Sequence, residues 1–153
     1  MNISKFTQKA MQAVQDLEKV AYEYGNQEIE EEHLLYALLT QEDSLILKLI
    51  EKMEIDSDVF LAQVEGAVRK RPQVQGGQVY IGQDLNKVLV YAENEAKALG
   101  DEYVSVEHLF LSLLRKPSKE IKQLFHDFQI DRERFLQALS KDRGNQKVTG
   151  KAG

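Results

Sequence analysis

The sequence contains no cysteine, so disulfide bonds and thiolate metal sites are excluded. Its formal net charge is −5 at pH 7. This charge disfavours a general nucleic-acid or anionic-membrane binder, because such proteins present a basic face. No apolar run reaches the length of a membrane span, and the first residues do not resemble a signal peptide. We therefore expect a cytoplasmic domain with no nucleic-acid partner and no membrane partner.

Motifs for catalysis and metal binding are missing too. The sequence has no His-Glu-x-x-His, no Ser-His-Asp arrangement and no Gly-x-Ser-x-Gly. Residues 145–152 superficially resemble a phosphate-binding loop. They lack a glycine at the first position and a Ser or Thr after the lysine, and no strand precedes them. We predict that this chain is not an enzyme and binds no cofactor or metal.

Apolar residues make up 42% of the 153 residues, enough to form the core of one domain. They recur at helical spacing, and Thr7, Asp56 and Asp131 are suited to cap helices. Residues 72–82 contain one proline and three glycines and are predicted to form a loop, in which a short strand would have no partner. The predicted helices lie at about residues 8–24, 30–39, 45–53, 57–71, 85–99, 107–114, 121–128 and 132–142.

The chain contains a duplication. Gly25 and the later Glu32-His33-Leu34 recur as Gly100 and Glu107-His108-Leu109, and the shift is 75 positions in both cases (100 − 25 and 108 − 33). The sequence therefore predicts an all-α fold of about eight helices, arranged as two tandem four-helix repeats with pseudo-two-fold symmetry. We place the repeats at residues 1–71 and 83–142 of one compact domain, joined by a loop at 72–82. Residues 143–153 are expected to form a flexible connector.

The repeated histidines invite two interpretations. A metal or hydrolytic site is one, but each histidine directly follows a glutamate, and adjacent helix positions do not face the same ligand. We favour a structural motif in which His33 and His108 bond locally at a helix start, while Gly25 and Gly100 end the preceding helices.

The acids beside these histidines allow a binding role. Carboxylates in the first turn of a helix are stabilising through the helix dipole, but the dipole does not explain why Glu32 and Glu107 hold the same register. A site for cationic side chains, including Asp101, is the alternative.

The two copies differ on one helix face. Val90 and Tyr91 occupy the positions of Gln15 and Asp16 in the first copy, off the predicted core stripe. An exposed apolar patch of this kind suits weak peptide binding. The alternative is that the loop at 72–82 folds over it.

The duplicated Gly-(Asn/Asp)…(Ile/Val)-x-x-Glu-His-Leu-x-x-x-Leu-Leu pattern resembles the N-terminal domain of the Clp-type AAA+ unfoldases. The resemblance covers about residues 2–142, and the opening Phe6-Thr7-x-Lys-Ala and the linker Arg71-Pro72-Gln73-Val74-x-Gly76 look most like the ClpB disaggregases. ATP and Mg²⁺ would be bound by AAA+ modules that this sequence does not contain.

The resemblance implies a cap that binds unfolded or aggregated polypeptides, and possible adaptor proteins, for the AAA+ modules of the same chain. The isolated domain would be a monomer and the full-length protein a hexamer. The resemblance implies polar substrate contacts at Thr7, Asp101 and Glu107. It also implies an apolar groove, which is matched here by Val88, Leu89 and Tyr91, while Glu95 is a charged departure from the family's pattern. In the ClpC branch the counterparts of Glu32 and Glu107 receive phosphoarginine, but Glu30 and Glu31 here would repel a phosphate.

Overall fold

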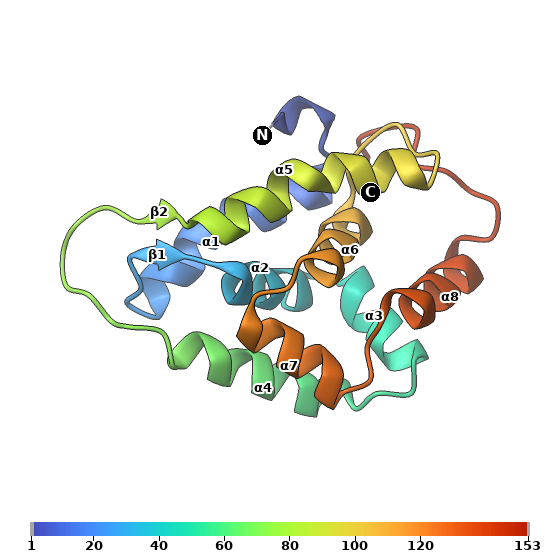
Figure 1. The fold of residues 1–153 in the computed structure, drawn as a ribbon. Coiled ribbons are helices and arrows are strands. Elements are labelled where there is room, and N and C mark those ends of the chain that lie inside the picture. Colours follow the sequence, from blue (N-terminus) through green and yellow to red (C-terminus); the bar gives the residue numbers. More distant parts are fainter. Residues whose placement is uncertain (1, 153) are drawn as a thin grey trace.

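The computed structural model describes residues 2–152. Within them the chain forms eight α-helices, one 3₁₀ turn and two very short strands (Figure 1), which confirms the all-α prediction. In chain order the elements are η1 Ile3–Lys5, α1 Gln8–Glu23, β1 Glu28–Ile29, α2 Glu31–Leu39, α3 Leu45–Lys52, α4 Ser57–Arg69, β2 Tyr80–Ile81, α5 Gln83–Ala98, α6 Val106–Arg115, α7 Lys119–Asp127 and α8 Arg132–Arg143.

The helix starts are set by side-chain caps. Thr7 accepts a hydrogen bond from the Ala10 N–H at 3.2 Å, and Asp131 accepts one from the Arg134 N–H at 2.8 Å. Asp56 caps α4 in the same way. Each cap satisfies an N–H group that has no partner inside its helix. These caps explain why the predicted and observed starts agree.

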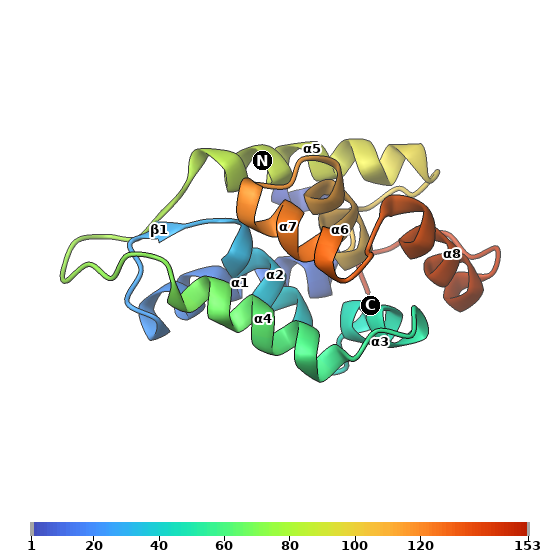
Figure 2. The same cartoon turned by 60° about the horizontal axis from the view of Figure 1, so that its bottom comes forward.

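The two copies share one core, at whose centre lie α2 and α6. Figures 1 and 2 show both helices in the middle of the molecule, surrounded by the others. Nearly every residue of these two helices is buried, including Leu34 and Leu109. Phe60 of the first copy packs edge-on against Phe128 of the second, with ring centroids 5.0 Å apart. The Glu-His-Leu stretch therefore builds the central pair of helices.

Short strand contacts interlock the copies. β1 pairs in parallel with β2, with Ile29 opposite Ile81. The matching contact is a bridge between Phe6 and Val104, which are the same register positions (81 − 75 and 29 + 75). The prediction that residues 79–81 have no strand partner was wrong. The partner lies in the other copy, about fifty positions away, where a local reading of the sequence does not find it.

The residues after α8, here called the tail (residues 144–152), fold back on the domain instead of leaving it. The Val148 N–H donates to Asp101 Oδ1 at 2.9 Å, and the Glu102 N–H donates to the Val148 carbonyl at 2.8 Å. The expectation of a flexible connector did not include these contacts, because the tail contributes only backbone groups to them. Such contacts leave no pattern in the side chains of the tail.

Candidate functional site

The start of α6 is organised by His108, which is completely buried. Its Nδ1 accepts the Ser105 N–H at 2.8 Å, and its Nε2 lies 2.7 Å from Asp101 Oδ2. Because Nδ1 is an acceptor, Nε2 carries the proton and donates to the carboxylate. Burial lowers the pKa of His108, while the neighbouring Glu107 and Asp101 act in the opposite direction. The ring thereby ties the turn after α5 to the first turn of α6.

The first copy repeats this arrangement with one change. His33 Nδ1 accepts the Glu30 N–H at 2.9 Å, and Nε2 lies 2.9 Å from Asn26 Oδ1. Asn26 stands where Asp101 stands in the second copy, so the partner here is neutral. Burial lowers the pKa of His33 to about 4, and the imidazole is uncharged at neutral pH. Gly25 and Gly100 precede these turns with φ of 72° and 73°, in the left-handed region that suits glycine.

An arginine from α8 joins the two acids of the second copy. Arg143 Nη1 lies 2.8 Å from Asp101 Oδ2, and its Nη2 lies 2.8 Å from Glu107 Oε2. Burial alone would raise the pKa of Asp101. Hydrogen bonds from the Val148 N–H, His108 and Arg143 outweigh it and hold the pKa below its usual range. The two predicted acidic site residues of this copy, Asp101 and Glu107, are therefore buried and already bonded to cationic or N–H donors.

The first copy has a similar arginine. Arg71 Nη1 lies 3.0 Å from Glu32 Oε2, and Nη2 lies 2.7 Å from Glu28 Oε1. Glu32, one of the acids considered for a site that binds cationic side chains, is thus already paired with a cation of this chain. Only 4% of the Glu32 side chain is exposed. A substrate arginine would have to displace Arg71 before it could reach this carboxylate.

Thr7 reveals a second difference between the copies. It is buried, caps α1, and corresponds in register to Gly82 before α5 (7 + 75). Because Gly82 has no side chain, Glu30 caps α5 from the other copy and accepts the Leu85 N–H at 2.9 Å. A Cβ at Gly82 would lie 2.5 Å from the Glu30 carboxylate carbon, so this carboxylate fills the space beside Gly82.

The equivalent space in the second copy is open. A cavity of about 370 Å³ lies beside Thr7, Ser105 and Glu107. Ser105 is the register counterpart of Glu30 and is too short to fill it. The tail forms one wall of the cavity through residues 147–150 and Ala152. The structure thus brings Thr7 and Glu107 together at one cavity, with Asp101 beneath the tail.

The apolar residues predicted for a surface groove are divided between surface and core. Val90 and Tyr91, here called the α5 pair, are 42% and 46% exposed. At these exposures the loop at 72–82 does not cover them. Val88 and Leu89 are 1% exposed, so these two predicted substrate contacts lie in the core of this structure and not on its surface. The helical period turns these two side chains towards the core stripe of α5.

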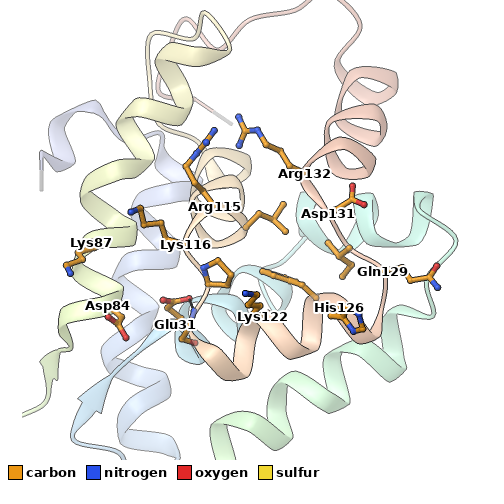
Figure 3. Close-up of a pocket in the computed structure, with 15 residues that line it drawn as sticks. Glu31, Asp84, Lys87, Arg115, Lys116, Lys122, His126, Gln129, Asp131 and Arg132 are labelled. Carbon is orange, nitrogen blue, oxygen red and sulfur yellow. Dashed lines mark hydrogen bonds between the residues drawn. The ribbon is translucent and has the colours of Figure 1, made fainter.

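Glu95, which departs from the apolar groove pattern, is buried at 2% exposure. It corresponds to Val20 in the first copy (20 + 75) and is paired with Arg115 and Arg132. Burial raises the pKa of Glu95, but the two guanidinium groups lower it by more, so the pKa lies below its usual range. Figure 3 shows both arginine heads side by side at one end of a cavity of about 980 Å³. At the position where the family pattern has an apolar groove residue, the second copy therefore has a buried charge cluster of Glu95, Arg115 and Arg132.

At the other end of this cavity lies Glu31 (Figure 3). It is 1% exposed and accepts the Ser118 N–H at 2.9 Å. Burial raises the pKa of Glu31 to about 7, against the lowering effect of the Ser118 bond. Glu30 and Glu31 were expected to repel a phosphate. Instead, each carboxylate bonds a backbone N–H of the second copy and ties the two repeats together.

Two negative findings concern residues 2–152. No group of three or more His, Cys, Asp or Glu side chains in this range is arranged to hold a metal ion. None of the helices described is both long and apolar enough to cross a bilayer.

Several solved structures have this fold. The N-terminal domain of Hsp104 from Candida albicans aligns with a TM-score of 0.83 at 21% identity, covering 96% of this chain and 97% of that one. The N-domain of ClpV, solved in complex with a VipB peptide, aligns with a TM-score of 0.69 at 20% identity, covering 90% of this chain and 86% of that one. The architecture is that of a Clp-type N-domain.

This chain belongs to the Clp repeat (R) N-terminal domain family, whose model matches residues 5–128. Among curated relatives, the chaperone protein ClpB of Nitratidesulfovibrio vulgaris is 40% identical over 155 residues, and that of Bacillus cereus is 36% identical over 154. Each match covers 97% of this chain and 18% of the relative's length. The resemblance to ClpB inferred from the sequence is confirmed.

Three participants in the site were not found from the sequence. Arg143 was assigned to the flexible connector at 143–153, although a basic residue in the last turn of a helix is a known stabilising feature. Glu30 was expected to repel a phosphate and not to cap α5. Val148 acts through its backbone alone, which no side-chain pattern reports.

Proposed function

We propose that this chain is the substrate-recognition domain of a ClpB-like, ATP-dependent chaperone. It binds exposed apolar segments of unfolded or aggregated proteins and delivers them to AAA+ modules. The observation that carries the proposal is the α5 pair, an aliphatic residue and an aromatic ring exposed where the first copy has Gln15 and Asp16. Aromatic side chains on a surface are the residue type that most often supplies binding energy between proteins.

Two further observations support this function. The ClpB relatives share the whole chain at 36–40% identity, and a ClpV N-domain with the same fold was solved with a bound peptide. An N-domain of this kind contributes recognition, and the ATPase chemistry would be supplied by the modules that follow.

The proposal is tested by binding to fluorescently labelled casein, a protein without a stable fold. The double substitution Val90→Ser with Tyr91→Ser should weaken binding by about tenfold, since an anchoring aromatic side chain contributes on the order of 1–2 kcal/mol. Tyr22→Ser is the matched control, because Tyr22 lies on α1 and is 58% exposed. An equal loss in both variants, or none in either, would contradict the site assignment.

The alternative is a ClpC- or ClpA-type domain that binds adaptors or phosphoarginine-tagged substrates. Its supporting observation is that Glu32 and Glu107 do each hold a guanidinium group, although from Arg71 and Arg143 of this chain. Free phosphoarginine titrated into the domain separates the two functions. Saturable binding that Glu32→Ala and Glu107→Ala weaken would favour the alternative, and no heat of binding is expected from the proposed function.

A further inference from the structure

The tail lies in a groove whose polar groups are mostly backbone. The Val148 N–H and carbonyl pair with Asp101 Oδ1 and the Glu102 N–H, and the Gln8 N–H donates to the Lys151 carbonyl at 2.7 Å. Lys147 Nζ donates to the Leu99 carbonyl at 2.8 Å, at the end of α5. These receiving groups, on Gln8, Leu99, Asp101 and Glu102, are called the tail groove below.

The tail groove makes few demands on the sequence of its occupant. Three of its four hydrogen bonds go to main-chain atoms of the tail, which any extended segment possesses. The fourth hydrogen bond and one further contact involve lysine side chains of the tail. Lys147 sits at the C-terminus of α5, where a cation is favoured by the helix dipole, and the Lys151 ammonium lies 6.0 Å from the centre of the Tyr103 ring. The groove therefore suits an extended segment that carries basic residues.

The tail is held loosely compared with what it covers. Residues 144–152 are exposed except for Val148, which is half-buried, whereas Thr7, Asp101 and Glu107 are buried. A segment with little buried apolar area and solvent-exposed hydrogen bonds opens at low free-energy cost. The tail also walls the 370 Å³ cavity, so its departure would turn that cavity into an open cleft beside Thr7 and Glu107.

The first copy shows what a permanent cover looks like. There the residues after α4 cross the turn at residues 25–27, with the Val74 N–H donating to the Gly25 carbonyl at 2.9 Å. They continue to Tyr80, whose N–H donates to the Gln27 carbonyl at 2.9 Å. That cover is fixed between α4 and α5, and β2 pairs it to β1. The tail forms no strand pair of this kind among the residues described.

We propose that residues 147–151 are an internal ligand of the tail groove, and that extended basic segments of other polypeptides bind there by displacing the tail. The proposal rests on the proposed function in so far as those polypeptides are chaperone substrates. It adds a second recognition element to the α5 pair. This element binds the backbone of an extended chain, and the carbonyl at the end of α5 accepts a hydrogen bond from a lysine of that chain.

The test uses the whole chain and a synthetic peptide of residues 145–152. Val148→Pro removes the N–H that donates to Asp101 and releases the tail. Thr149→Pro is the matched control, since the Thr149 N–H makes no hydrogen bond with any residue that the structure describes. Loss of a hydrogen bond to a carboxylate should let the labelled peptide bind the Val148→Pro protein about tenfold more tightly than the wild type or the Thr149→Pro protein.

Equal binding of the peptide to all three proteins, or to none, would overturn the proposal. Lys147→Ala should shift the peptide affinity in the same direction by a smaller factor, which keeps the test decisive if the proline variant is poorly folded. Labelled casein should also bind the Val148→Pro protein more tightly. If the peptide behaves as expected but casein binds none of the proteins, the proposed function fails while the tail remains the ligand of its groove.

Discussion

The two copies of the repeat share one scaffold but close the space beside it differently. In the first copy the Glu30 carboxylate caps α5 and fills the position next to Gly82. In the second copy Ser105 is short, Thr7 caps its own helix, and a cavity remains under the tail. The α5 pair also has no apolar counterpart in the first copy. Duplication therefore supplied the fold twice, and divergence left one copy with free surface.

The largest expected effect comes from breaking the buried ion pair between Asp101 and Arg143. Asp101→Ala leaves Arg143, the His108 Nε2–H and the Val148 N–H without their common acceptor. Removing one partner of a buried ion pair typically costs about 3–5 kcal/mol. Asn26→Ala in the first copy removes a neutral acceptor and should cost only about 1–3 kcal/mol. Urea unfolding measures both, and equal losses would show that the charge of Asp101 adds nothing.

A smaller loss is expected from Glu30→Ala. The substitution removes the carboxylate that caps α5 across the repeat boundary, and a lost N-cap costs about 0.5–2 kcal/mol. Thr7→Ala removes the corresponding cap of α1 and should cost a similar amount. Only Glu30→Ala should also open a cleft beside Gly82. Increased binding of the tail peptide to Glu30→Ala but not to Thr7→Ala would show that Glu30 closes the first-copy site.

The fold was largely predictable from the sequence, whereas the closure of the two sites was not. Helix positions follow from apolar spacing and from caps such as Asp131, which act over one turn. The duplication also predicted the shared core. Glu30 and Arg143, by contrast, act across the repeat boundary or from the last turn of α8, and their partners are chosen by three-dimensional proximity. The burial of Glu95 was missed because a charged residue is normally expected on the surface. Its two arginine partners lie on other helices, so the sequence does not show the pairing.

The Glu31 carboxyl makes the repeat boundary sensitive to pH. Its pKa is raised to about 7 in the folded protein, so the folded state holds a proton that the unfolded chain releases near its ordinary, lower pKa. Stability from this group is full below the unfolded pKa and declines as the pH rises towards 7. Glu31→Gln keeps the acceptor for the Ser118 N–H, and should raise the free energy of unfolding by about 3 kcal/mol at pH 8 and by clearly less at pH 5. Unfolding of both proteins at the two pH values is the measurement, and a pH-independent difference would contradict this origin.

The smallest change in stability is expected when the second copy is made like the first at Glu95. Glu95→Val introduces the residue that the first copy has at position 20. Arg115 is 53% exposed and can return to water, and buried ion pairs are often replaced by apolar residues at little cost. Unfolding free energy should therefore change by within about 1 kcal/mol. A much larger loss would mean that the arginine cluster is itself essential to the fold.

The central claim is that the second copy, and not the first, carries the binding surface. Backbone amide NMR of the domain titrated with unlabelled casein tests it directly, because register positions in the two copies serve as each other's controls. The account predicts shifts at Tyr91 and Glu102, with little change at their first-copy counterparts Asp16 and Gln27. Equal shifts in both sets, or shifts confined to the counterparts, would contradict it.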